Sequence, residues 1–507
     1  MKWTRLSTFV WMAAIGLLFA LHLLHLRADF PNFSPWMDYS KYTDEGWYGS
    51  AAIRHNLSGS WRVPGDFNPA VALPVWPLLE GIVFHFTGVS LAAARLLVLA
   101  VFAGNLLLTY SLIRTRHSQP LALLGATLVA ASAFLYAFGR LAILEPLVIF
   151  WMLLSWLLAL RLPKASASAR ILILAAIGLL SCLEILTKTT AIFLLPATMY
   201  LLWHAAGYRM RESVRYASLV AAAGFIPWAA YFFLFVRPHY LSDYLYLFAA
   251  NKWDQPATAG GWLMSFWYAI HGALWIDKPL CLLAVALLIL SARWLRELWK
   301  NPLFVASLLA AAGYIFFTGW HNNTQPRYYQ VVAFPLILAV CAGTALLLEK
   351  SKWAGASALA VIAVSLAMNV WLTAAFVRHP QHTFVTAAKG VTRYIDRHST
   401  GNRLLLSISG ANITLITHLP SICDDFGTYD LPYRIHIYNP GWYAAWNEID
   451  HGTLEDLHTQ YSLQQVAEFH AFDDPDRNRL ILYKLIPLPP DKQHYHAAME
   501  QAANAGK

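Results

Sequence analysis

The chain has 507 residues, of which 58% are hydrophobic and only 13% are charged. A water-soluble protein of this length needs more polar surface, so the composition excludes an ordinary soluble enzyme and indicates an integral membrane protein. The net charge of +9 would also suit a nucleic-acid-binding protein. That class is excluded because the sequence lacks long polar stretches with a clustered basic face.

Charge divides the chain near Arg378. Residues 1–377 contain 26 Lys and Arg against 14 Asp and Glu, whereas residues 378–507 contain 11 against 14. We therefore expect a transmembrane domain over 1–377, with a long external first loop at 27–90, and a soluble α/β domain over 378–507. The four cysteines show no pairing pattern, so a disulfide framework is not expected.

Apolar runs near the roughly 20 residues that a helix needs to cross a bilayer recur along residues 1–377. They lie near 8–26, 91–113, 120–138, 141–160, 171–187, 189–206, 216–236, 270–291, 303–319, 329–348 and 354–377. The sequence therefore predicts a mainly α, polytopic fold with about eleven membrane spans.

Lys and Arg in the short loops predict the orientation of these spans. If the N-terminus is cytoplasmic, every cytoplasmic loop is basic, through Arg114 and Arg116; Arg161, Lys164 and Arg170; Arg209, Arg211 and Arg215; Arg293, Arg296 and Lys300; and Lys350 and Lys352. An odd number of spans then places the first loop and the C-terminal domain outside the cytoplasm. The first span is expected to remain as an anchor, because no small-residue cleavage site follows it.

The hydrophobic period changes after Arg378. It predicts helices near 383–398 and 453–469, and strands at 404–409, 413–418, 433–438 and 479–486. This mixture is typical of a small α/β domain.

Two adjacent acids, Asp44 and Glu45, lie in the first external loop at the start of an apparent amphipathic helix. One interpretation is structural, because acids are favoured at helix N-termini. The other is a carboxylate that acts as a general base at the membrane surface.

Further charged residues are expected at the same external level. Arg140 and Glu145 flank one short turn, Lys188 ends the next pair of spans, and Arg327 begins another span. Each cation alone could simply extend to the lipid headgroups. Together they are better explained by an anionic ligand, because external loops are normally poor in positive charge.

In order and sidedness, these residues resemble those of the class C glycosyltransferases that take sugar from polyprenyl-phosphate carriers, notably the protein mannosyltransferase and aminoarabinose transferase branch. The resemblance covers most of residues 1–377 and rests on the Asp44-Glu45 pair, the turn from Arg140 to Glu145, Leu-Thr-Lys at Lys188 and Pro-Arg-Tyr at Arg327. It implies that the first-loop acid Asp44 is catalytic, with Glu45 as its neighbour.

The chemistry suits these residue types. When a sugar–phosphate bond breaks, negative charge grows on the departing phosphate, so fixed cations stabilise the transition state. Lys188, Arg327 and Arg140 are the candidates for binding the donor phosphate. A carboxylate across the sugar would accept the proton of the attacking hydroxyl, and in-line attack predicts inversion. Further candidates for substrate binding are Glu145, Tyr48 and Tyr328.

No ligand set has zinc spacing, so no metal site is assigned. Some class C enzymes use a divalent cation, so binding of one by Asp44, Glu45 and Glu145 remains an alternative. The expected partners are a polyprenyl-phosphate-linked sugar, membrane lipids and a lipid, polysaccharide or protein acceptor, with no nucleic acid. A transporter or flippase for a lipid-linked substrate is the competing function, and it predicts charges at the bilayer midplane and broken helices.

Overall fold

The computed structural model describes residues 5–29, 36, 38–62, 69–250, 255–424, 431–472 and 477–493. Contacts divide the chain into two compact units. The first, here the helical unit, comprises Met1–Leu26, Val98–Arg237 and Lys252–His379. The second, here the mixed unit, comprises Arg27–Leu97, Pro238–Asn251 and Pro380–Lys507. The loop over 27–90 thus belongs to the same compact unit as the C-terminal segment, and an independent domain over 378–507 stays a prediction.

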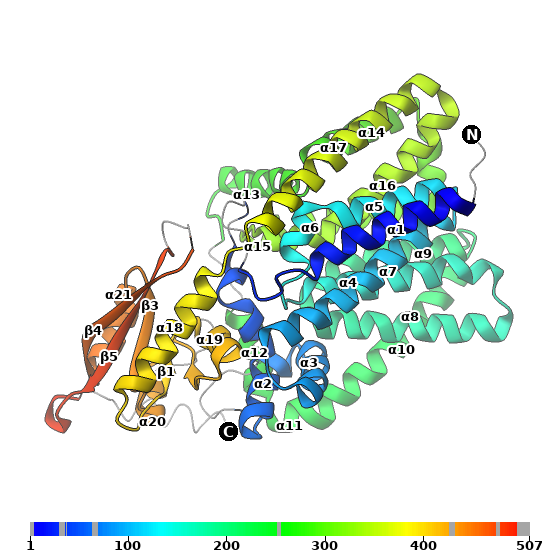
Figure 1. Cartoon of the computed structure of the whole chain (residues 1–507). Coiled ribbons are helices and arrows are strands. Elements are labelled where there is room, and N and C mark those ends of the chain that lie inside the picture. Colours follow the sequence, from blue (N-terminus) through cyan, green and yellow to red (C-terminus); the bar gives the residue numbers. More distant parts are fainter. Residues whose placement is uncertain are drawn as a thin grey trace. The chain divides into compact units, whose positions relative to one another are not determined.

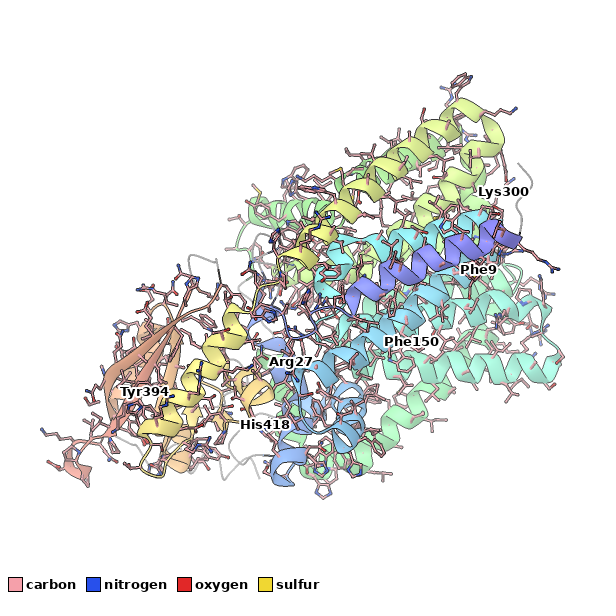
Figure 2. All side chains as sticks on the ribbon, in the orientation of Figure 1. Phe9, Arg27, Phe150, Lys300, Tyr394 and His418 are labelled. Carbon is pink, nitrogen blue, oxygen red and sulfur yellow. The ribbon has the colours of Figure 1, made fainter. Side chains whose placement is uncertain are left out.

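The helical unit is built from long apolar helices. They are α1 (Arg5–His22), most of α4 (Leu91–Arg114), α5 (Gln119–Ala131), α6 (Ala133–Phe138), α7 (Glu145–Arg161), α8 (Ala167–Thr187), α9 (Leu195–Ala205), α10 (Met210–Tyr231), α13 (Ala259–Gly272), α14 (Lys278–Ser291), α15 (Pro302–His321), α16 (Tyr329–Lys350) and α17 (Lys352–Arg378). Apolar side chains such as Phe9 project outward from α1 (Figure 2), which suits a helix that faces lipid.

A mainly α, membrane-spanning fold is confirmed, but the number of about eleven spans is not. The described residues contain eight helices that are long and apolar enough to cross a membrane, or nine if one bent pair counts as a span. The difference comes from three expected spans. Residues 120–138 break at Ser132, 189–206 begin as a 3₁₀ helix, and 270–291 bend by 117° between α13 and α14. A run of apolar residues predicts that a segment is buried in lipid or protein, but it does not predict where the helix within that segment breaks.

Asn369 of α17 connects two of these breaks. Its side-chain amide donates to Asp277 Oδ2 at 2.6 Å, and Asp277 caps the start of α14 by accepting from the Leu280 amide at 2.8 Å. Its carbonyl oxygen accepts from the amide of Ala133, the first residue of α6, at 2.8 Å. Backbone groups cannot be left without partners in hydrocarbon. Asn369 therefore compensates directly for the break before α6, and it holds Asp277, which compensates for the break before α14.

We expect Asn369→Leu to lower the stability of the folded protein in detergent by about 1–2 kcal/mol, because the Ala133 amide loses its acceptor and Asp277 loses a donor. Thermal unfolding followed by tryptophan fluorescence measures the effect. Met368→Leu, at the exposed neighbouring position, is the matched control. Equal stability of the two variants would contradict this role.

The mixed unit combines helices with one sheet. Its elements are α2 (Asp44–Ser58), α3 (Val75–Thr87), the first turns of α4, α12 (Leu241–Ala250), α18 (Thr383–His398), β1 (Leu405–Leu406), α19 (Gly410–Thr417), β2 (Ser421–Ile422), α20 (Leu431–Tyr438), β3 (Trp442–Trp446), α21 (His451–His458), β4 (Tyr461–His470) and β5 (Arg479–Pro487), with the short α11 (Arg237–His239) at its boundary. The strand order is β2-β1-β3-β5-β4. Strands β1, β2 and β3 are parallel, whereas β5 pairs antiparallel with β3 and β4.

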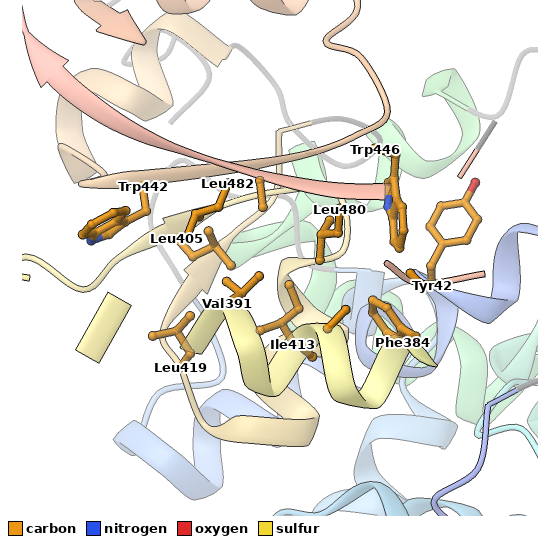
Figure 3. Packing of buried hydrophobic residues seen from close by; sticks show 14 of the residues in the cluster. Tyr42, Phe384, Val391, Leu405, Ile413, Leu419, Trp442, Trp446, Leu480 and Leu482 are labelled. Carbon is orange, nitrogen blue, oxygen red and sulfur yellow. The ribbon is translucent and has the colours of Figure 1, made fainter. Parts of the chain in front are cut away.

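Helices α18 and α19 pack on this sheet through one apolar cluster (Figure 3). Val391 of α18 lies near Leu405 of β1, and the ring of Phe384 lies 5.8 Å from that of Trp446 in β3. Tyr42, from the loop over 27–90, joins the same cluster and lies edge-on to Trp446, with ring centroids 5.5 Å apart. The loop that carries the two acids is therefore anchored in the core of the C-terminal segment.

Several expected elements of the C-terminal segment are correct. The helix at 383–398 is α18, the strand at 479–486 is β5, and the strand at 404–409 is present as the two residues of β1. Figure 1 shows α18, in yellow, beside the orange and red strands.

Three expectations for the C-terminal segment are wrong. Residues 413–417 of this expected strand lie in helix α19. The hydroxyls of Thr414 and Thr417 donate to carbonyls four residues earlier, so these β-branched residues fit a helix. Residues 433–438 lie in helix α20, whose Pro432 occupies the first turn, where proline is tolerated. The helix near 453–469 ends at His458, because β4 pairs with β5 from Tyr461 onward.

Candidate active site

Asp44 and Glu45 are the first two residues of α2, and both are buried. Acids at this position interact favourably with the positive end of the helix dipole. The hydroxyl of Thr43 donates to Asp44 Oδ1 at 2.9 Å. The carboxylate of Asp44 is therefore oriented by its own chain neighbour.

Glu45 is held by an arginine that the sequence analysis did not select. Arg95, in the first turns of α4, donates from Nε to Glu45 Oε1 at 2.7 Å and from Nη2 to Glu45 Oε2 at 2.6 Å. Its Nη1 donates to the carbonyl of Ala28. Such a two-pronged pair is strong and directional, so Glu45 serves to anchor α2 while Asp44 remains the candidate base. The sequence offered one sign of this role, because Arg95 is a charged residue within the apolar run at 91–113, where charges are rare unless they are functional or paired.

Glu80 of α3 is a third buried carboxyl beside this pair, and it was also missed. It is 0% exposed, and neither side-chain oxygen has a hydrogen-bond partner among the described residues. The carboxyl lies against Gly49 of α2, where an added Cβ would overlap it. Burial, with a smaller contribution from the nearby charge of Glu45, raises the pKa of Glu80 well above its ordinary value.

A small internal cavity lies within the mixed unit, next to the Glu45–Arg95 pair. It has room for about one water molecule. Its lining joins the first loop to the C-terminal segment, through Asp29, Lys41, Glu45, Leu91, Arg95, Phe384, Val385, Asn412, Leu415 and Ile416. The cavity is too small for a sugar, so it belongs to the scaffold behind the acids.

In the helical unit, four of the candidate residues form one cluster. Glu145, the first residue of α7, makes a buried ion pair with Lys188, which directly follows α8. Lys188 Nζ lies 4.5 Å from the centre of the Tyr328 ring, and Arg327 Cζ lies 4.8 Å from the same ring. Arg327 Nη2 also donates to the Tyr328 hydroxyl at 3.4 Å. One aromatic ring thus holds two cations, as cation–π attraction favours.

Arg140 has different partners. Its Nη2 donates to the carbonyls of Leu24 and His25 at 3.0 and 2.6 Å, and its Nη1 donates to the hydroxyl of Tyr136. These contacts satisfy carbonyls of the turn that follows α1. The geometry supports a structural role for Arg140 more strongly than the expected contact with a donor phosphate.

The candidate residues therefore fall into two groups. Tyr48 is half-buried on α2 with Asp44 and Glu45, its ring 5.0 Å from that of Trp47, and these residues belong to the mixed unit. The cluster around Tyr328 belongs to the helical unit. A single pocket that contains both groups stays a prediction.

The acids are poorly suited to bind a metal ion. Glu45 is engaged with Arg95 and Glu145 with Lys188, so either would have to leave a buried ion pair. In the described part of the chain, no three His, Cys, Asp or Glu side chains are placed to share an ion. No catalytic step is therefore assigned to a metal.

Comparison with known proteins identifies the fold. Residues 69–231 match the family described as dolichyl-phosphate-mannose-protein mannosyltransferase. The structure is similar to that of ArnT from Cupriavidus metallidurans bound to undecaprenyl phosphate, with a TM-score of 0.60, 13% identity, and coverage of 96% of this chain and 99% of that one. The chain has a class C glycosyltransferase fold.

A second structure of this class agrees. The apo oligosaccharyltransferase of Archaeoglobus fulgidus is similar with a TM-score of 0.55 and 12% identity, over 96% of this chain and 77% of that one. Among curated proteins, none matches the sequence. At these identities the similarity establishes the class C fold, and the reaction has to be argued from the site.

The Glu145–Lys188 pair can be tested by removing one or both charges. Lys188→Gln should lower stability by about 3–5 kcal/mol, because it leaves a carboxylate buried without its cation. Glu145→Gln combined with Lys188→Gln should restore most of this loss. Thermal unfolding in detergent measures both variants, and a single variant as stable as the double one would contradict the pairing.

Glu80 predicts a dependence of stability on pH. The folded protein holds this proton to a higher pH than the unfolded chain, so the wild type should lose stability as pH rises above the ordinary carboxyl range. Glu80→Gln should remove this slope and make the protein more stable than the wild type at pH 7, because the amide cannot ionise in the unfolded chain. Thermal unfolding between pH 5 and pH 8 measures it. The exposed Glu455→Gln should keep the wild-type slope, and an unchanged slope in Glu80→Gln would refute the assignment.

Proposed function

We propose that the protein is a membrane glycosyltransferase that transfers one sugar from a polyprenyl-phosphate donor to an acceptor at the extracytoplasmic face, with inversion. The observation that carries the proposal is that two cations, Lys188 and Arg327, both lie against the ring of Tyr328. The N-terminus is taken to be cytoplasmic and the mixed unit to be external, as the basic loops predict.

The Tyr328 cluster suits a departing phosphate. Lys188 and Arg327 contribute two positive charges and Glu145 one negative charge, so these side chains carry a net positive charge. Both cations are buried, which strengthens their interaction with an anion relative to water. Because they are already in place, they stabilise growing negative charge without reorganising.

Asp44 is the proposed general base, which accepts the proton of the attacking hydroxyl. As the acceptor hydroxyl attacks the anomeric carbon, a new carbon–oxygen bond forms and the bond from that carbon to the phosphate oxygen breaks. The hydroxyl proton passes to Asp44, and polyprenyl phosphate leaves from the opposite face of the sugar. Attack from the side opposite the leaving group inverts the anomeric configuration.

The structural relatives support a lipid-linked donor. The structure of ArnT is described with bound undecaprenyl phosphate, and an oligosaccharyltransferase of the same fold is described with a tethered acceptor peptide. For this chain we propose a polyprenyl phosphate as carrier and a lipid, polysaccharide or protein as acceptor.

Substitution of Asp44 tests the base. Asp44→Asn should lower kcat by about 10²–10⁴-fold, since the amide cannot accept the proton. Binding of polyprenyl phosphate should be unchanged, because the cation cluster is intact. Transfer from radiolabelled polyprenyl-phosphate sugars by purified protein in nanodiscs measures kcat.

Asp396→Asn is the matched control, because Asp396 is a half-exposed carboxylate of the mixed unit that pairs with Arg403. It should retain wild-type transfer. Undiminished transfer by folded Asp44→Asn would rule out Asp44 as the base. Flux of the lipid across sealed vesicles without a new glycosidic bond would favour the transporter instead.

A further inference from the structure

The N-terminus of α2 has an unusual cap. The first N–H groups of a helix have no partner within it, and the N-cap side chain normally accepts from the second or third of them. Thr43 occupies the N-cap position of α2, but its side chain makes no such bond. Its hydroxyl instead donates to Asp44 Oδ1.

Asn412 of α19, 366 residues away along the chain, caps the N-terminus of α2 in place of Thr43. Its Oδ1 accepts from the amide N–H of Gly46, the third residue of α2. Asn412 is 3% exposed, so this bond is shielded from water. A Cβ at position 46 would overlap the backbone of Ala411 and Asn412. Glycine is therefore required here for α2 and α19 to approach this closely.

The chain that precedes the acids is tied to the same C-terminal segment at two further points. Asp29 accepts hydrogen bonds from the Thr383 hydroxyl and from the amides of Phe384 and Val385, at 3.0, 2.8 and 3.3 Å, and so caps α18. Closer to α2, Tyr42 is buried in the core cluster. The start of α2 and the chain before it are thus held at three points by residues beyond 380.

We propose that Asn412 is a positioning residue for Asp44, and that the C-terminal segment thereby sets the geometry of the acid. With Gly46 capped in trans, the Thr43 hydroxyl stays on Asp44 and fixes its carboxylate. When Asn412 is removed, the Thr43 side chain rotates to bring its oxygen to the Gly46 amide, and this rotation takes the hydroxyl away from Asp44. The proposal rests on the proposed function of Asp44 as the base.

Asn412→Ala should lower kcat about tenfold, as expected for a base that is misplaced but present. KM for the lipid-linked donor should remain unchanged, because the cations around Tyr328 are not touched. Thr43→Val should lower kcat similarly. The double variant should be no slower than either single variant, because both changes break the same arrangement.

Asn412→Asp provides a second measurement. It keeps an acceptor oxygen for Gly46 but adds a negative charge near Asp44 and Glu45. Like charge raises the pKa of a carboxyl, so the acidic limb of the pH profile of kcat/KM should move to higher pH.

Thr417→Val is the control for general damage to α19. It removes hydrogen bonds of Thr417 with Thr392 and Ile413 at the far end of the helix, away from Gly46. It should leave kcat unchanged, whatever its effect on thermal stability. If Asn412→Ala instead matches Thr417→Val in kcat, or if the effects of Asn412→Ala and Thr43→Val multiply, the positioning role is wrong.

Hydrogen–deuterium exchange separates this inference from the proposed function. Asn412→Ala should speed exchange in the peptide 43–50 relative to the wild type and to Thr417→Val. If no donor supports transfer by the wild type but this exchange increases, the cap is correct and the glycosyltransferase proposal fails. Unchanged exchange in Asn412→Ala would overturn the cap itself.

Discussion

A buried charge must be neutralised by a partner, and the buried pair of Glu45 and Arg95 is the interaction on which the acidic site depends. Arg95 lies in the first turns of α4 and Glu45 in the first turn of α2, so the pair fixes one helix start against the other. Because both prongs of the guanidinium are engaged, the pair specifies orientation as well as distance. Asp44, the adjacent residue, acquires its position from this anchor.

Adjacent acids thus have separate tasks. Glu45 is committed to Arg95, whereas Asp44 is oriented by the Thr43 hydroxyl. Burial raises the pKa of Glu80, whose side-chain oxygens have no hydrogen-bond partner among the described residues. In the helical unit the balance is reversed, since Lys188 and Arg327 outnumber Glu145 around Tyr328. In the proposed reaction, Asp44 would accept the proton and the cations around Tyr328 would stabilise the departing phosphate, which are the two requirements of glycosyl transfer from a phosphate carrier.

Helix breaks determine how the membrane part is built. Apolar composition favours burial of each segment, but it does not specify whether a segment is one straight helix. The breaks before α6 and α14 persist because Asn369 and Asp277 satisfy the exposed backbone amides. Polar side chains thus stabilise two of the three breaks by which the number of spans differs from the number of apolar runs.

The sequence by itself determined the membrane class, the apolar segments, helix α18, strand β5 and the candidates Asp44, Lys188 and Arg327, because each follows from local composition or from charge at a helix end. Tertiary structure alone decided that Arg95 holds Glu45 across 50 residues, that Asn412 caps Gly46 across 366, and that residues 413–417 lie in a helix. The reason is that a side chain's partner depends on which distant segments pack together. The local hydrophobic pattern does not predict which distant segments pack together.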